Sequence, residues 1–338
     1  MEKKTLEDIS RLTGFSKTVI SRVLNGKAED YRISQATVEK ILRTCEEEQY
    51  TPNFYAQTLR KRSSKSIGLI LPQLSYAFFG NMATIIISEA YRHGYMVSVV
   101  GTMEDPRLEA NVLRTMIDRQ MDGIIISPCT HNSDTILREV AAEMPLIQVD
   151  RYLTDEGLSY ITTDNYEGAK LGMKLLIEHG HKRILCIQQG VNFQPTIERV
   201  RAVTDMARIH NVEIMLRGDD TTKKSGYVET MIALSSPNPP TAIFTMNTYL
   251  MTGVLQALRE KGLKAPEDIS LISFDDSKLL DYTEPPVTRI AQPVESIGMA
   301  AVKILMQGIA EKKPINVRMM MSAELISRDS VRRLPADK

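Results

Sequence analysis

Short apolar runs alternate with amphipathic stretches along most of the chain, from Ile67 onward. The runs read IGLIL, YMVSVVG, GIIIS, PLIQVD, RILCIQ, TAIFTM and DISLISF. Alternation of this kind is typical of crossover units, in which parallel strands are covered by helices on both faces. About 270 residues of this pattern are too many for one small sheet. We therefore expect an α/β domain of two lobes, with a ligand cleft at the carboxyl ends of the strands.

The N-terminal residues 5–25, TLEDISRLTGFSKTVISRVLN, follow a different pattern. They predict two short helices separated by a turn at Gly14. Thr5 is expected to cap the first helix together with the aspartate three residues later, and Ser16 is expected to cap the second. Asn25 and the glycine after it would end the second helix. These signals agree with one another and predict a helix-turn-helix.

The second of these helices has two distinct faces at about 100° per residue. One arc is polar and contains Lys17, Thr18, Ser21 and Arg22. The opposite arc is apolar and contains Val19, Ile20, Val23 and Leu24. The apolar arc can pack against the rest of the domain while the polar arc stays free for a partner. This division favours a helix that reads DNA over an ordinary solvated helix face.

Charge is unevenly distributed along the chain. The whole sequence contains 42 basic and 42 acidic residues, which argues against a generally basic nucleic-acid coat. Residues 1–65, however, contain 13 lysines and arginines against 9 aspartates and glutamates, and the remainder has the opposite excess. The basic excess therefore accompanies the predicted helix-turn-helix, where contacts with phosphates would need it.

A third helix is predicted from a cap at Ser34 to about Gln49. Its apolar stripe would consist of Val38, Ile41, Leu42 and Cys45. This stripe would close a small three-helix core.

The segment 50–66, YTPNFYAQTLRKRSSKS, is predicted to be a linker. It is either a solvated tether or contains a stretch from Asn53 to about Leu59 that becomes helical against DNA, and its basic cluster does not decide between these. The predicted organisation is a DNA-binding domain over 1–50, a hinge over 51–65 and an effector-binding and dimerisation domain over 66–338.

Several classes of protein do not fit the sequence. The three cysteines, Cys45, Cys129 and Cys186, are too few and too scattered for a disulfide framework or a zinc site. The N-terminus has no apolar stretch of signal-peptide length, and no run approaches the ~18 apolar residues of a membrane span. We expect a cytoplasmic protein that makes no membrane contact.

Nothing in the sequence indicates a reaction, a metal or a cofactor. His179 and His181 flank a glycine at a predicted helix-to-strand turn and have basic neighbours, so a turn role is favoured over metal binding. The pair Asp275-Asp276 is not accompanied by a phosphate-binding loop, a G-x-S-x-G elbow or an HExxH helix. The sequence therefore favours a binding protein over an enzyme.

A set of motifs distributed over nearly the whole chain carries a family resemblance. They are TLEDISRLTGFSKTVISRVLNG at 5–26, YTPNFYAQTL at 50–59, IGLILP at 67–72, EHGHKRI at 178–184, EDISLISFDDS at 267–277, PPVTRIAQP at 285–293 and LISRDSV at 325–331. In this order they resemble the lactose-repressor and purine-repressor (LacI/GalR) family of bacterial transcription regulators.

The resemblance implies a homodimer, or a dimer of dimers, that binds a palindromic double-stranded DNA operator. The recognition helix would lie in the major groove, with Arg22 suited to guanine, and the linker would form a paired hinge helix in the minor groove with Leu59 as a wedge. The DNA-contacting residues implied in this way are Thr5, Ser16, Lys17, Thr18, Ser21, Arg22, Asn25, Asn53, Gln57 and Leu59.

The resemblance also implies an effector domain similar to the periplasmic sugar-binding proteins. The N-lobe would comprise about 66–162 and 293–324, and the C-lobe about 163–292 and 325–335. The effector contacts implied between the lobes are Tyr76, Phe78, Asp150, Asp164, Arg199, Asn247, Asp275 and Gln292, with Phe79 near them. For each aspartate the alternative is a helix cap or a loop turn.

The chemistry of these residues suits a polar metabolite. Carboxylates accept paired hydroxyl groups, Arg199 can donate a planar fork, and Asn247 and Gln292 can both donate and accept. We therefore expect a repressor whose operator affinity is controlled by a sugar, a sugar phosphate or a related compound. The alternatives are a solute-binding protein, which would need a secretory signal, and a sugar-metabolising enzyme, which would need a nucleophile or phosphate loop.

The sequence departs from the family pattern in several places. The loop GKAEDYRI, between Asn25 and Ser34, is longer than in the lactose repressor. Asn247 is followed by threonine where relatives often have aspartate, and Ala202 stands where they often have glycine. The cleft position that is often aromatic falls in residues 219–226, DDTTKKSG, which offer no ring. We therefore expect a weak stacking wall, which favours a sugar over a nucleobase.

Overall fold

The computed structural model describes residues 4–50, 63–129, 134–154, 157–190 and 193–335, and its contacts divide the chain into two units, Met1–Ser64 and Lys65–Lys338. The predicted hinge contacts Asn53, Gln57 and Leu59 lie outside the described residues.

The first unit is a three-helix domain. Its helices are α1 (Leu6–Thr13), α2 (Lys17–Leu24) and α3 (Gln35–Glu47). The predicted capping box is confirmed, since Thr5 accepts from the Asp8 N–H and Asp8 accepts from the Thr5 N–H at 3.0 Å. Ser16 caps α2 and Ser34 caps α3, as predicted. These capping residues therefore determine where the three helices begin.

The core of this unit consists of a few side chains from all three helices. The buried members are Ile9, Ile20, Val23, Ile41 and Cys45. The prediction that Leu42 belongs to the apolar stripe is wrong, because its side chain is 48% exposed. Ile41 and Cys45 are four residues apart and lie on one face, whereas Leu42 is rotated by about 100° from Ile41 and leaves that face.

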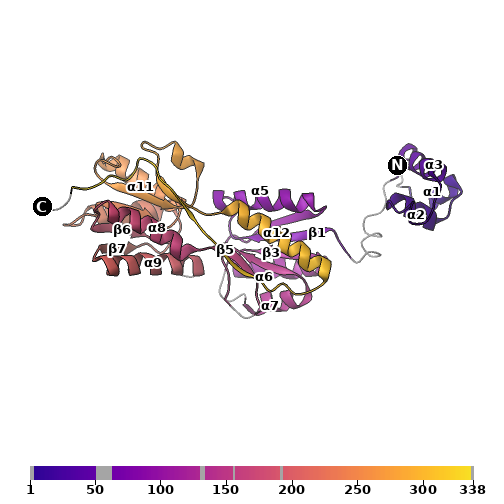
Figure 1. The fold of residues 1–338 in the computed structure, drawn as a ribbon, viewed down its shortest axis with the longest axis horizontal. Coiled ribbons are helices and arrows are strands. Elements are labelled where there is room, and N and C mark those ends of the chain that lie inside the picture. The colour runs from indigo at the N-terminus through magenta and orange to yellow at the C-terminus, as the bar shows by residue number, and fades with distance from the viewer. Residues whose placement is uncertain (1–3, 51–62, 130–133, 155–156, 191–192, 336–338) are drawn as a thin grey trace. The chain divides into compact units, whose positions relative to one another are not determined.

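The N-lobe of the second unit is built on a six-stranded parallel sheet in the order β11-β5-β4-β3-β1-β2. The strands are β1 (Ser66–Leu71), β2 (Met96–Gly101), β3 (Gly123–Ile126), β4 (Leu146–Val149), β5 (Tyr160–Thr163) and β11 (Arg318–Met321). Helices α5 (Ala77–Arg92) and α12 (Val294–Glu311) cover one face, and α6 (Pro106–Asp118) and α7 (Asp134–Glu143) cover the other (Figure 1).

The C-lobe repeats this architecture with a second six-stranded sheet in the order β12-β10-β9-β8-β6-β7. The strands are β6 (Arg183–Ile187), β7 (Glu213–Arg217), β8 (Ala242–Thr245), β9 (Ser270–Phe274), β10 (Thr288–Ala291) and β12 (Glu324–Ile326), the last of which is antiparallel to β10. Helices α8 (Asn165–Glu178) and α9 (Gln194–His210) pack on one face, and α10 (Lys223–Leu234) and α11 (Thr248–Lys261) pack on the other. A 3₁₀ helix, η2 (Lys278–Asp281), follows β9.

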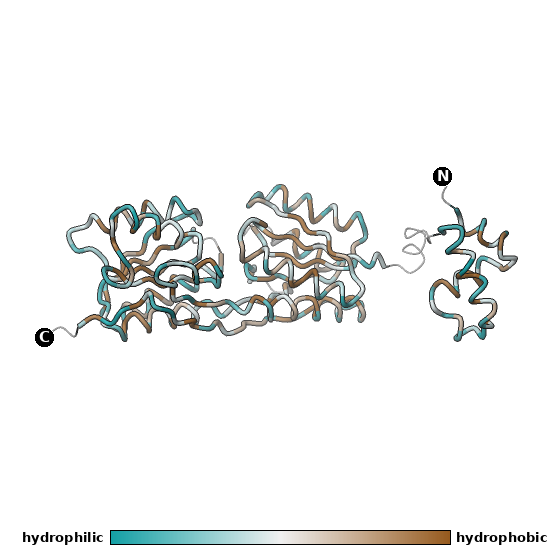
Figure 2. The backbone as a smooth tube through the Cα atoms, turned by 90° about the horizontal axis from the view of Figure 1, so that it is seen from above, coloured by the Kyte–Doolittle hydropathy of each residue, from teal (hydrophilic) through white to brown (hydrophobic). Residues whose placement is uncertain are grey.

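Hydrophobic residues are concentrated along the strands inside each lobe (Figure 2). The predicted α/β class is confirmed, and all seven predicted strands are present. Five further strands, β5, β7, β10, β11 and β12, carry weaker apolar patterns. β7 and β11 are outer strands of their sheets and none of their residues is fully buried, so they need fewer apolar residues.

The chain passes between the two lobes three times. The passages follow β5, follow β10 and separate β11 from β12. They bring the carboxyl ends of the parallel strands in each lobe to the region between the lobes, where α/β proteins bind ligands. Among the described helices, none combines the length and the apolar composition that crossing a bilayer requires.

Candidate functional site

The polar arc of α2 is open to solvent in the first unit. Lys17 and Thr18 are exposed, and Ser21 and Arg22 are half-buried. Lys17 forms a 2.8 Å ion pair with Glu7 of α1, and this exposed contact can exchange for a phosphate at little cost. The polar side chains of α2 therefore lie at the surface of the unit while Ile20 and Val23 on the opposite face fill the core.

Three other predicted DNA contacts lie at helix termini in this unit. Thr5 caps α1, Ser16 caps α2, and Asn25 closes α2 by donating from its side-chain amide to the Ser21 carbonyl at 2.6 Å. The sequence did not single out Tyr31, whose ring stacks on the Arg22 guanidinium with 3.6 Å between the guanidinium carbon and the ring centroid. Tyr31 lies in the longer loop between α2 and α3.

A cleft with a volume of about 340 Å³ lies between the lobes of the second unit. Its lining includes seven of the predicted effector contacts, namely Tyr76, Phe78, Asp150, Arg199, Asn247, Asp275 and Gln292. Asp164 is not part of the lining. Its carboxylate caps α8 by accepting from the Glu167 N–H at 3.0 Å, which corresponds to the helix-cap alternative.

Two carboxylates and one guanidinium occupy the floor of the cleft. Asp150 and Asp275 directly follow β4 and β9, and both have left-handed backbone conformations, with φ of 62° and 75°. Arg199 of α9 is 3% exposed and lies 3.9 Å from an Asp275 oxygen. The Gln292 amide donates to the same carboxylate at 2.6 Å. Parallel strands thus bring together acidic groups that are far apart in the sequence.

Arg199 is held firmly by groups of its own lobe. Its Nε donates to Asn165 at 2.7 Å, and its Nη1 donates to the Met246 carbonyl at 2.6 Å. The guanidinium also stacks on the Phe274 ring at 3.6 Å. A ligand could accept hydrogen bonds from the remaining N–H groups of this guanidinium. The arginine therefore serves both the fold and the cleft.

Burial raises the pKa of both carboxylates at the floor of the cleft. It raises the pKa of Asp150 to about 6 even though Arg151 and Arg199 act in the opposite direction. It also raises the pKa of Asp275, again against Arg199 and the Gln292 hydrogen bond. Desolvation therefore outweighs the nearby cations at both carboxylates.

The cleft lining contains more aromatic side chains than the ring-free segment 219–226 led us to expect. Tyr76, Phe78 and Phe79 of the N-lobe face a lining to which the C-lobe contributes Phe193 and Tyr249. Phe193 immediately precedes α9, and Tyr249 is in the first turn of α11. The aromatic side chains come from other segments than 219–226. The absence of a ring in segment 219–226 therefore does not favour a sugar over a nucleobase.

The aromatic side chains also connect the lobes. The rings of Tyr76 and Tyr249 lie 4.5 Å apart, and the Tyr249 hydroxyl donates to the Ser75 carbonyl at 3.1 Å. The Tyr76 and Thr221 hydroxyls are 3.2 Å apart. The start of α5 in one lobe and the start of α11 in the other are therefore in direct contact beside the cleft.

The second arginine of the lining, Arg151, is neutralised within the N-lobe. It forms a bidentate pair with Glu104 at 2.7 and 3.0 Å, and its guanidinium lies 4.1 Å from the centre of the Phe193 ring. In the part of the chain that the structure describes, both arginines that line the cleft therefore have carboxylate partners. An anionic ligand would find no unpaired cation there.

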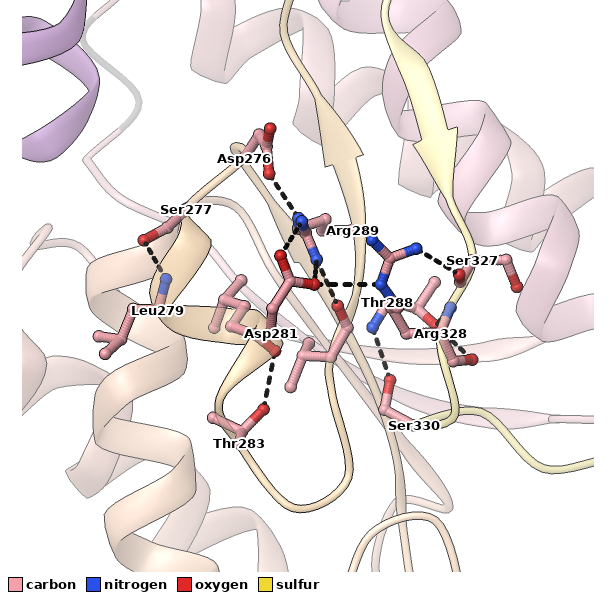
Figure 3. Close-up of polar contacts among 12 residues, drawn as sticks. Asp276, Ser277, Leu279, Asp281, Thr283, Thr288, Arg289, Ser327, Arg328 and Ser330 are labelled. Carbon is pink, nitrogen blue, oxygen red and sulfur yellow. Dashed lines mark hydrogen bonds and ion pairs between the residues drawn. The ribbon is translucent and has the colours of Figure 1, made fainter.

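A network of ion pairs fixes the loop that carries Asp275 (Figure 3). Arg289 is 3% exposed and donates a hydrogen bond of 2.6 Å to Asp276. It donates two further hydrogen bonds, of 2.8 and 2.9 Å, to the carboxylate of Asp281 in η2. Arg328 reaches the same Asp281 carboxylate at 3.0 Å. These contacts attach the cleft loop to β10 and to the segment after β12.

The structure offers no metal site among its described residues, where no three histidine, cysteine, aspartate or glutamate side chains cluster. His179 ends α8, as the predicted turn role requires. His181 is buried and bonds Thr241 and the Arg332 carbonyl, and burial lowers its pKa to about 4. Both histidines thus have structural positions.

Both units match models of known protein families. Residues 5–53 match the family model for bacterial regulatory proteins of the lacI family, and residues 173–331 match a periplasmic binding protein-like domain. The chain is 29% identical over 333 residues to the HTH-type transcriptional repressor PurR of Aliivibrio fischeri, covering 97% of this chain and 98% of the relative. It is also 29% identical over 334 residues to the HTH-type transcriptional regulator DegA of Bacillus subtilis, with the same coverage.

Among solved structures, the crystal structure of the lac repressor dimer bound to operator and the anti-inducer ONPF shares the fold. The TM-score is 0.89 at 22% identity, and the match covers 98% of this chain and all of that one. The relatives are transcription regulators, and this chain is a DNA-binding regulator of that kind rather than an enzyme. With a lacI-type helix-turn-helix joined to a two-lobed binding domain, the chain belongs to the LacI family of bacterial regulatory proteins.

Proposed function

We propose that the protein is a cytoplasmic homodimeric repressor whose affinity for a palindromic operator is controlled by a neutral polyhydroxyl compound in the cleft. The observation that carries the ligand assignment is the charge of the lining. Two buried carboxylates, Asp150 and Asp275, face the cleft, and its arginines are already paired.

A neutral hydroxylated ligand suits this lining for a simple reason. Hydroxyl groups can donate to Asp150 and Asp275, and they can accept from Asn247 and the free edge of Arg199. A phosphorylated ligand would bring further negative charge toward two carboxylates in a low-dielectric site, which is costly without an unpaired cation. We therefore narrow the expected effector from sugars and sugar phosphates to neutral sugars and related polyols.

The aromatic side chains of the cleft add a requirement for shape. The rings of Tyr76 and Tyr249 are tilted by 42° against each other, and the apolar face of a sugar ring could pack against either of them. A nucleobase could use the same rings. It offers fewer hydroxyl donors to the two carboxylates, so it is the competing ligand class.

The DNA-binding part of the proposal rests on the polar arc of α2. Lys17, Thr18 and Arg22 are presented together while Ile20 and Val23 are buried. A family model of regulators covers this helix. We propose that these three side chains reach base edges in the major groove, with the other predicted contacts of the unit positioned on the backbone.

Exposed apolar residues on the second unit support dimer formation. Tyr91 at the end of α5 is 79% exposed, Met96 at the start of β2 is 75% exposed, and Tyr282 after η2 is 85% exposed. Large side chains of this type are enriched where protein surfaces meet. A two-fold dimer would place two recognition helices on the half-sites of a palindrome.

The test has a DNA arm and a ligand arm. The full chain is incubated with a random duplex pool, and we expect selection of a palindromic sequence. The ligand arm measures thermal shifts with neutral sugars, sugar phosphates and nucleosides, because a ligand that binds the folded state raises its melting temperature. We expect stabilisation by a neutral sugar or polyol, and its loss in Asp275→Ala.

Coupling between the two arms is measured by calorimetric titration of the stabilising compound with and without operator. Linkage requires operator to change the affinity for the compound by the same factor by which the compound changes the affinity for operator. Stabilisation by phosphorylated sugars alone would contradict the neutral-ligand assignment. Identical titrations with and without operator would remove the cleft as a control site.

A further inference from the structure

The Arg22 side chain of the recognition helix α2 has an aromatic partner in the loop that follows the helix. Its guanidinium carbon lies 3.6 Å from the centre of the Tyr31 ring. Tyr31 is 49% exposed, and Arg22 is half-buried. Among the residues that the structure describes, no carboxylate forms an ion pair with Arg22. The ring is therefore the contact that fixes this side chain.

The loop that carries Tyr31 is itself held in place. The Lys27 N–H donates to the Arg22 carbonyl at 2.9 Å, and the Ile33 N–H donates to the Ala28 carbonyl at 2.9 Å. Ala28 and Ile33 also pack against the buried core of the unit. The ring is thus presented from a closed, anchored turn.

Stacking has a specific consequence for an arginine that reads DNA. The ring occupies one flat face of the guanidinium, while the N–H groups that recognise guanine point outward in the guanidinium plane. The stack therefore leaves the reading edge free. It also restricts the rotamers of a flexible side chain, so that less conformational entropy is lost on binding.

We propose that Tyr31 is a positioning residue for DNA readout, which orients Arg22 toward one base pair and thereby helps to determine operator specificity. The proposal rests on the DNA-binding function given above. It predicts that Tyr31 acts through Arg22 and contributes to sequence discrimination. A residue that merely adds a phosphate contact would strengthen binding to every duplex to a similar extent.

The test uses the full chain and the operator selected from the random pool. Binding is measured for wild type, Tyr31→Ala, Tyr31→Phe, Arg22→Ala and the double variant Tyr31→Ala/Arg22→Ala. The duplexes are the operator, a set with each base pair replaced in turn, and a non-specific duplex of equal length. Circular dichroism melting of each variant verifies that the three-helix unit is folded.

We expect Tyr31→Ala to weaken operator binding about three- to tenfold while leaving non-specific binding unchanged. Its discrimination should fall at the same base pair as in Arg22→Ala. Tyr31→Phe keeps the ring and should stay within about twofold of wild type. In the Arg22→Ala background, removal of the ring should have no further effect, because the two side chains act as one unit.

Each contrary result overturns the role of Tyr31 in a distinct way. Equal losses on operator and non-specific DNA would identify a phosphate contact, and tighter operator binding by Tyr31→Ala would show that the ring holds Arg22 away from DNA. A loss in Tyr31→Phe equal to that in Tyr31→Ala would assign the effect to the hydroxyl, and additive losses in the double variant would show independent action. A wild-type chain that selects no duplex would instead contradict the DNA-binding function itself.

Discussion

In the first unit, the side chains proposed to reach base edges lie on the outside of one helix of eight residues. In the second unit, the side chains proposed to meet a ligand come from the ends of separate strands and helices and are buried against one another. Lys17 and Thr18 are exposed, whereas Asp150 is 7% and Arg199 3% exposed. The DNA face can therefore be changed with little effect on folding, but the floor of the cleft cannot.

The difference has an energetic origin. An exposed polar group keeps its water until a partner arrives, whereas a buried charge has already lost its water and depends on the groups around it. Substitutions in the cleft should therefore change stability strongly and in both directions. Substitutions on α2 should change DNA binding while leaving stability almost unchanged.

The largest effect is expected for Arg199→Met. The substitution leaves the buried Asp150 and Asp275 without their shared cation and removes the bond to the Met246 carbonyl. Removal of one partner from a buried charge cluster typically costs about 3–5 kcal/mol. Denaturant unfolding at pH 7 measures the loss in the free energy of unfolding.

The matched control is Arg201→Ala, in the same helix. The Arg201 side chain is 57% exposed and pairs with Glu198, so its removal should cost no more than about 1 kcal/mol. If Arg199→Met unfolded at the same denaturant concentration as this control, the cleft floor would be energetically no different from the surface.

Asp150→Asn should have the opposite sign and raise the free energy of unfolding by about 1–3 kcal/mol at pH 7. The folded-state pKa of Asp150 is about 6, above its ordinary value of 3.8. Folding therefore favours the protonated form of Asp150. Above pH 6 the charged carboxylate lowers the free energy of unfolding, and this loss of stability shrinks as the pH falls from 6 toward 3.8. Asparagine keeps the shape, lacks the charge and tolerates the left-handed backbone.

The pH dependence provides the check for this variant. Unfolding of wild type and Asp150→Asn is compared at pH 7 and pH 5, and the difference should be smaller at pH 5. The variant should also lose the thermal response to the cleft ligand. A stability difference that is the same at both pH values would show that the gain does not come from the buried charge.

Arg22→Ala should reduce operator affinity by about 1–3 kcal/mol, with a smaller loss on random DNA, because a bidentate contact with a base would be lost. Its melting temperature should match that of wild type. Lys17→Ala serves as the comparison, because a lysine on phosphate would weaken binding to all duplexes. A drop in melting temperature for Arg22→Ala would mean that this face is part of the fold.

The smallest effect is expected for Ser16→Ala. Ser16 accepts from the Val19 N–H at 3.4 Å, and loss of such a cap typically costs about 1 kcal/mol. The loss should appear in the melting of the first unit, followed by hydrogen exchange of its amides. Exchange in the cleft domain should be unaffected. Slower folding or faster exchange in both units would show that they are not energetically separate.

The same contrast explains which features could be predicted from the sequence. Helix caps at Thr5, Ser16 and Ser34 depend on residues three positions away, so local patterns identified them. The buried strands could also be predicted, because each of them is a continuous apolar run. Leu42 was assigned to the core because a hydrophobic residue next to the stripe is not distinguished by periodicity alone.

The cleft was only partly predictable, because its members meet through the packing of two sheets. Aspartates at strand ends could be found, since the carboxyl ends of parallel strands share one edge. Phe193 and Tyr249 were missed because each precedes or begins a helix and carries no periodic signal. The pairing of Arg151 with Glu104 was also missed, since the two residues are far apart in the chain.

The repeated passage of the chain between the lobes has a consequence for biosynthesis. The N-lobe sheet begins at Ser66, but α12, one of the two helices that cover the same face of this sheet, begins only at Val294 and contributes Ile297, Ala301 and Leu305 to the core. At ~5–20 residues per second, the ribosome needs roughly 10 to 50 seconds to make the intervening chain. During that interval the part of the apolar sheet face that α12 covers in the complete protein stays exposed, so a nascent chain of this protein should be a client for chaperones that shield hydrophobic surfaces.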